Sequence, residues 1–253
     1  MAKMIILFDD IFSDYSVLSA TTEATGYPKE YLDDPNPANK WRSTVITESI
    51  VKVNMGAAVA MQGACMINHN MVAGDTTFKF EASSNDFAAT HNTGDFTLKT
   101  FDVKGVTKRN AFRIVSTTYQ YYQWRLQKVA GTYIEFGTPF IAAKKYEFIK
   151  SENMDYIKGR DRVFVQNITR NGHTVKSRRY SNLIYSFDCF GILDAQRVYL
   201  EAIGEYDYVC ILPENTAGTE FHFGVIEFSL PKRIVKGGIL YWQMSGKFTE
   251  SAF

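Results

Sequence analysis

The amino-acid sequence predicts a mainly β protein, with a β-sandwich followed by a smaller β-rich domain that contains one helix. Short segments in which apolar and polar residues alternate recur along the chain, and this period of two is typical of half-buried strands. Aromatic residues make up 15% of the sequence, and Tyr and Phe favour strands and bury large areas. One later segment changes to a spacing of three and four residues, which indicates a helix.

The first half of the chain contains the expected elements of the sandwich. An apolar run at residues 4–8, directly before Asp9 and Asp10, predicts a leading strand. Later segments alternate with a period of two and are mostly bounded by Gly, Asn, Asp or Ser. They cover residues 51–55, 77–81, 96–99, 122–127 and 133–136. One apolar face per strand is the pattern of a sandwich.

A polar stretch at residues 143–162 predicts a boundary between a β-sandwich domain at residues 1–147 and a β-rich (α+β) domain at residues 148–253. The helix is expected from Ile192 to Ile203, with Gly204 as its C-terminal cap. Strands are expected on both sides of it, over residues 163–167, 174–179, 183–189, 208–212, 221–228 and 239–244.

The bulk composition excludes several classes of protein. The net charge is +1, so no overall field attracts nucleic acid or an anionic membrane. No apolar run approaches the length of a membrane span or a secretory signal, and we expect a soluble protein that folds in a reducing cytosol. The sequence has three cysteines, and no two of them have CxxC spacing. We expect buried free thiols at Cys65, Cys189 and Cys210.

The sequence offers little catalytic chemistry, and we expect a protein that is not an enzyme and needs no cofactor. None of the four histidines has metal-ligand spacing to another His or a Cys, and no nucleophile elbow occurs. On a strand, Glu220 and His222 share one face while Thr219 points to the other, which leaves the acid and the imidazole without a nucleophile.

One loop contains Asp33, Asp34, Pro35 and Pro37. Adjacent carboxylates in such a loop are poorly placed to act as the pair of a glycosidase, which leaves two interpretations. Asp caps backbone amides and Pro fixes φ, so the residues suit turns; alternatively, the carboxylates form part of a structural Ca2+ site.

Several residues are candidates for a ligand site or a protein interface. Trp41 is either a core anchor or a stacking platform for a sugar, with Arg42 beside it. His69 either holds a loop through side-chain bonds or takes part in a sugar or protein contact. The complete set of ligand or interface candidates is Tyr27, Trp41, Arg42, Asn68, His69, Asn70 and Tyr121.

A basic hairpin is expected around the turn Asn171-Gly172. Its basic side chains either face solvent or contact an acidic partner or DNA. They are Arg170, Lys176, Arg178 and Arg179.

The order of short motifs resembles the discoidin-like (galactose-binding-like) jelly roll carried by tail proteins of bacteriophages and prophages. The motifs are the lead-in at residues 22–28, the loop at 32–43, and the segments at 66–71, 124–126 and 133–137. The resemblance implies a non-enzymatic structural component of the tail, tail tip or baseplate of a virion, made in the host cytoplasm. It would assemble with other tail proteins and with copies of itself. The alternative is a carbohydrate-binding module for glycans of the host surface.

Overall fold

The computed structural model describes residues 4–34, 36, 38–71, 77–87, 96–97, 99–100, 110–148, 154–168, 174–212 and 221–251. The fold class expected from the sequence is confirmed, because strands dominate the described residues and α1 (Asp194–Ile203) is their single α-helix. Backbone contacts group the chain into two compact units. We call Met4–Glu147 with Ile211–Phe221 the sandwich unit, and Phe148–Cys210 with His222–Ala252 the helix unit. The expected domain division at 147/148, as a boundary between independently folding parts, stays a prediction.

The sandwich unit is built from short and long antiparallel strands. Two 3-10 turns, η1 (Phe12–Asp14) and η2 (Lys29–Asp33), lie between them. The strands are β1 (Ile5–Asp10), β2 (Val17–Ala20), β3 (Trp41–Arg42), β4 (Ser49–Met66), β5 (Thr77–Ser83), β6 (Phe96–Thr97), β7 (Lys99–Thr100), β8 (Ala111–Gln127), β9 (Glu135–Phe136) and β10 (Pro139–Glu147).

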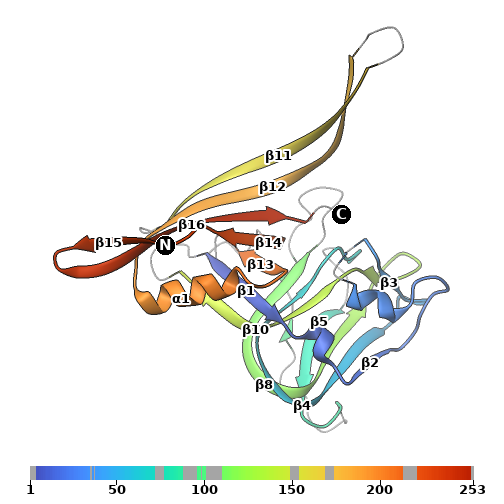
Figure 1. The fold of residues 1–253 in the computed structure, drawn as a ribbon. Helices are drawn as coiled ribbons and strands as arrows, with labels where there is room; N and C mark the ends of the chain where they lie inside the picture. Colours follow the sequence, from blue (N-terminus) through green and yellow to red (C-terminus); the bar gives the residue numbers. More distant parts are fainter. Residues whose placement is uncertain are drawn as a thin grey trace. The chain divides into compact units, whose positions relative to one another are not determined.

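The long strands β4 and β8 each serve both layers of the sandwich. The first part of β4 pairs with β2 and with the last part of β8, which also pairs with β5. The last part of β4 pairs with β10 and with the first part of β8, and β10 continues to β1. Both strands curve from one layer into the other (Figure 1).

The register between β4 and β8 shifts between the paired positions Asn54 and Val59, and Gly56 lies in this interval. Gly56 has φ +78°, and a Cβ there would lie 2.4 Å from Oγ of Ser16. Its N–H donates to Oδ1 of Asn54 at 2.8 Å. The positive φ favours glycine at this irregularity of the strand.

Aromatic side chains fill the space between the layers. Trp124 is completely buried and packs edge-on against Phe80, with ring centroids 5.1 Å apart. Phe80 stacks on Tyr122, and Trp41 packs edge-on against Phe136 at 5.4 Å. Aliphatic residues of both layers join the same core: Val51, Val53, Leu126, Met61, Ala64 and Ile141. Burial of this apolar surface is the main stabilising contribution.

The helix unit contains a second group of antiparallel strands in the order β11-β12-β16-β14, with β15 beside β16. The bounds are β11 (Met154–Ile168), β12 (Thr174–Ile192), β14 (His222–Phe228), β15 (Lys232–Lys236) and β16 (Ile239–Glu250). The short strand β13 (Val209–Leu212) is fully buried. Helix α1 contacts β14 and β16 and buries Leu200 and Ile203.

Two expectations about this half need correction. Strand β11 begins at Met154 rather than at residue 163, because the polar stretch pairs with β12 despite its charges. The helix begins at Asp194 rather than Ile192. Gly204 ends the helix as expected, with φ −67° in the right-handed region.

All three cysteines are buried and free, as expected. Burial, together with the charge of Asp188, raises the pKa of the Cys189 thiol to about 12, so this thiol stays protonated at neutral pH. No helix within the described residues has the length and apolar character needed to cross a membrane.

Candidate functional site

The most distinctive polar site of the sandwich unit is centred on Arg42. Its guanidinium lies between two tyrosine rings, 3.8 Å from the centroid of Tyr27 and 4.0 Å from that of Tyr133. The Nε and Nη2 atoms of Arg42 donate to Oε2 of Glu135 at 3.1 and 2.8 Å. Lys40 donates to the other carboxylate oxygen at 3.0 Å. We call these five residues the Arg42 cluster.

Backbone pairing brings the cluster together from distant parts of the sequence. Strands β3 and β9 pair antiparallel, with Arg42 opposite Glu135 and Trp41 opposite Phe136. The N–H of Arg42 donates to the carbonyl of Tyr27 at 3.3 Å, which holds the turn at Gly26 (φ +81°) across the strand. Because neighbouring residues of a strand face opposite sides, Arg42 and Glu135 point outward together.

Trp41 points the other way and is completely buried, with Nε1 donating to the carbonyl of Thr22 at 3.1 Å. This is the position of a core anchor, and its ring is covered rather than available for stacking on a ligand. The tryptophan fixes the strand from inside, while Arg42 remains partly exposed on the outside, with 24% of its side chain accessible.

The charge of Glu135 is maintained by its two cations. Burial by itself raises the pKa of this carboxyl, but the hydrogen bonds from Lys40 and Arg42 outweigh burial and hold the pKa below its ordinary value. The cluster therefore presents an ionised carboxylate and two cations at neutral pH.

Asn70 supports the cluster from behind. Its Oδ1 accepts from the N–H of Glu135 at 3.0 Å, and its Nδ2 donates to the carbonyl of Tyr133 at 3.1 Å. Its backbone N–H donates to the carbonyl of Glu135 at 3.0 Å. One amide side chain thus fixes the backbone on which both Tyr133 and Glu135 are carried.

The other candidates from sequence lie apart from this surface. His69 is buried, and its Nδ1 accepts from the N–H of Met71 at 3.1 Å. Asn68 has a positive φ of 57°, and its N–H donates to Oδ1 of Asn110 at 3.1 Å. Tyr121 lies on β8 in register with Asn54 and Ser83. The structure thus brings Tyr27, Arg42 and Asn70 together and leaves the rest outside the cluster.

Of the basic hairpin, Arg170 lies outside the described residues, as do the turn residues Asn171 and Gly172. Lys176, Arg178 and Arg179 belong to β12, where Lys176 pairs with Gln166 and Arg178 pairs with Phe164. The positions of their side chains are outside the described part of the structure.

Sequence reasoning missed Tyr133, Glu135 and Lys40 as site residues. The segment 133–137 was recognised as a motif, and its alternation places Tyr133 and Glu135 on the same face. This shared face could have indicated that both residues belong to one surface site. The partner Arg42 lies 93 residues earlier, and the sequence contains no sign that the two segments pair.

The acidic loop before β3 uses its carboxylates in local hydrogen bonds. Oδ1 of Asp34 accepts from the N–H of Asn36 at 2.8 Å, and Oδ2 accepts from Nδ2 of Asn39 at 2.5 Å. The hydroxyl of Tyr15 donates to Asp33. The bond from the N–H of Asn36 to Asp34 is the capping of a backbone amide that was expected for this loop. Among the described residues, no group of three or more His, Cys, Asp or Glu could hold a metal ion.

The helix unit contains a buried chain of polar side chains that links three strands. The Tyr185 hydroxyl lies 3.1 Å from Nε2 of His222, and Nδ1 of His222 lies 2.9 Å from Oε1 of Glu250. Tyr185 and Glu250 are both buried and 13% of the His222 side chain is accessible, so the two partners of the imidazole are covered. Thr219 and Glu220, considered above with His222, lie outside the described residues.

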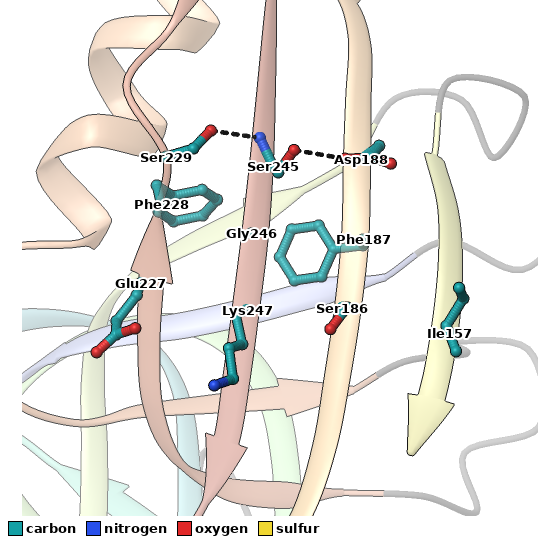
Figure 2. A pocket seen from close by; sticks show the side chains of 10 residues that line it. All are labelled: Ile157, Ser186, Phe187, Asp188, Glu227, Phe228, Ser229, Ser245, Gly246 and Lys247. Carbon is teal, nitrogen blue, oxygen red and sulfur yellow. Dashed lines mark hydrogen bonds between the residues drawn. The ribbon is translucent and has the colours of Figure 1, made fainter.

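An open groove of about 440 Å³ also lies on the helix unit, along β12, β16 and β14 (Figure 2). Its polar side chains bond across the strands: Ser245 donates its hydroxyl to Asp188 at 2.5 Å, and its N–H donates to Oγ of Ser229 at 2.9 Å. Phe187, which also lines the groove, is 2% exposed. Phe228 is the partly exposed ring of the groove, whereas the Arg42 cluster holds a cation between two partly exposed rings.

Comparison with known proteins gives fold likenesses only. No protein-family model matches the sequence, and no curated protein matches it. The structure is similar to chitosan-binding module 1 of a chitosanase/glucanase from Paenibacillus sp. IK-5 (12% identity, TM-score 0.40), covering 53% of this chain and 98% of the module. It is also similar to the family 32 carbohydrate-binding module of NanJ from C. perfringens, solved with galactose (14% identity, TM-score 0.38), covering 51% of this chain and 93% of that one. At such identities and TM-scores, these likenesses do not indicate a ligand for this chain.

Proposed function

We propose that the sandwich unit is a non-catalytic carbohydrate-binding module, and that the Arg42 cluster is its ligand site. The observation that carries the proposal is the guanidinium held between two partly exposed tyrosine rings and a carboxylate. Sugars combine an apolar C–H face with an edge of hydroxyl groups. A site with aromatic rings and a few fixed, charged hydrogen-bonding groups complements both features.

The cluster retains hydrogen-bonding capacity for a ligand. The Arg42 side chain bonds Glu135 through Nε and Nη2, and no described residue accepts from its Nη1. A guanidinium carries five N–H donors, so the two on Nη1 can reach sugar hydroxyls. Because Asn70 and the β3–β9 pairing already fix the site, binding would cost little ordering of side chains.

Binding of the full chain to a glycan array, followed by calorimetric titration with the best oligosaccharide, tests this proposal. We expect Tyr27→Ala and Tyr133→Ala each to weaken binding about tenfold, the loss expected from one stacking contact of about 1.4 kcal/mol. Tyr31→Ala is the matched control, because Tyr31 is 39% exposed and lies outside the cluster. Absence of binding to any glycan, or equal losses for all three variants, would refute the proposal.

The finer assignment to a tailed-phage virion, with other tail proteins as partners, rests on the sequence resemblance alone. It predicts that the chain is found in purified particles. Mass spectrometry of such virions tests it, and a chain that is made in infected cells but missing from the particles would exclude it.

A further inference from the structure

The hairpin formed by β11 and β12 extends beyond the other strands of the helix unit (Figure 1). Strand β11 pairs with β12 along its whole length, whereas β12 pairs with β16 only between Ile184 and Ile192. Residues 160–168 and 174–183 therefore form a two-stranded ribbon with no third strand among the described residues, which we call the arm. Two-stranded ribbons are marginally stable alone, so the arm is suited to a partner that covers it.

The arm is strongly basic. Asp161 is its single acidic residue within the described ranges. Its basic residues are Arg160, Arg162, Lys176, Arg178 and Arg179. The cations also argue against pairing between the edges of two arms, because charged residues along an edge strand oppose edge-to-edge addition. The partner is expected to be acidic and to cover the arm without extending its sheet.

A surface of opposite charge lies on α1 and the turn that follows it. Glu205 and Asp207 are exposed, and Glu201 precedes them on the helix. The nearby cation Arg197 is already bonded to Glu201 at 2.5 Å and to Asp194 at 2.9 Å, so the surface keeps excess negative charge.

Two apolar side chains of the same helix are also exposed. Val198 is 51% and Tyr199 is 37% exposed, although the sequence pattern places both on the apolar stripe of the helix. Exposed apolar groups beside charged ones are typical of protein interfaces. We call Val198, Tyr199, Glu201, Glu205 and Asp207 the helix patch.

We propose that the arm of one chain docks on the helix patch of a second copy of this chain. The arm has a net positive charge in its sequence and the helix patch a net negative one, and α1 makes its contacts within the unit mainly with β14 and β16 rather than with the arm. Because the two surfaces differ, the contact is head-to-tail, and successive copies close into a ring or extend as a filament.

Sedimentation velocity of the full chain over a wide concentration range tests the proposal. We expect self-association that weakens as salt is added. The arm variant (Arg160→Glu with Arg178→Glu) and the helix variant (Glu205→Lys with Asp207→Lys) should each associate at least about tenfold more weakly. An equimolar mixture of the two variants should associate again, because each supplies the charge that the other now needs.

The matched control is Lys232→Glu with Arg233→Glu on β15, outside both surfaces, and it should associate as the unmodified chain does. Circular dichroism and urea unfolding establish that each variant folds; if the arm variant does not, the helix variant still tests the contact. A chain that is monomeric at every concentration, or a mixture that stays monomeric, would overturn the proposal. So would a monomeric chain whose arm binds heparin, since an anionic polymer would then be the partner.

Discussion

The sandwich unit and the helix unit differ in how many of their large apolar side chains they leave exposed. In the sandwich unit, Trp41, Tyr122, Trp124 and Phe136 are completely buried between two layers. The helix unit leaves more large apolar side chains accessible among its described residues, including Leu193, Val198, Tyr199, Leu230, Val235 and Ile239. The helix unit also buries aromatic residues, such as Tyr185 and Phe223, but it leaves more of its large apolar side chains exposed.

This difference also separates the two proposals. The Arg42 cluster is a small, fixed group of polar and aromatic side chains supported by a closed core, which suits a small ligand. The arm and the helix patch are extended and charged, which suits a protein surface. A failure of glycan binding would leave the assembly proposal intact. Likewise, a chain that does not self-associate could still bind glycans at the Arg42 cluster.

The largest expected effect tests the core of the sandwich unit. Trp124→Ala removes a buried ring that packs against Phe80 and Phe12, and should lower the free energy of unfolding by about 3–5 kcal/mol. Trp124→Phe is the matched control, because it keeps an aromatic ring and removes an indole N–H that has no hydrogen-bond partner among the described residues. Urea unfolding measures both. Equal losses for the two variants would show that the ring does not support the core.

A smaller effect concerns Asp10 at the end of β1. Burial raises its pKa to about 7, although one carboxylate oxygen accepts from the N–H groups of Phe12 and Ile141. Between about pH 4 and 7 the folded chain therefore keeps a proton that the unfolded chain releases, so stability decreases as pH rises through this range and then levels off.

We expect a decrease of about 2 kcal/mol between pH 4.5 and pH 8, since partial exposure of the side chain reduces the full linkage contribution. Urea unfolding at several pH values measures it. Asp10→Asn removes the titrating group and should abolish this decrease relative to the unmodified chain. A variant with the same pH dependence as the unmodified chain would contradict the raised pKa.

The smallest expected effect lies in the helix unit. Val198→Ser removes an apolar side chain that is 51% exposed, and should change the free energy of unfolding of the monomer by less than about 0.5 kcal/mol. Leu200→Ala, two residues along the same helix, removes a buried side chain and should cost about 2–5 kcal/mol. Denaturant unfolding at low protein concentration compares them. A large loss for Val198→Ser would mean that its exposure does not reflect an available contact surface.

Part of the candidate site was within reach of the sequence. Tyr27, Arg42 and Asn70 were candidates, and the structure places all three in or directly behind the cluster. His69 and Trp41 were proposed with them, yet both are buried, since a short motif does not show which of its neighbouring side chains face inward. Tyr133 and Glu135 were not proposed, because their role depends on the partner strand.

The sequence by itself determined the class of fold and the local elements. Alternation with a period of two is a local property of strands, and it predicted most of them and the aromatic core. Tertiary structure alone decided that β3 pairs with β9, across 93 residues, and that the helix exposes Val198 and Tyr199. Pairings between distant strands depend on the packing of the whole core, and so does the choice of which apolar face is covered. Neither is encoded in a short stretch of chain.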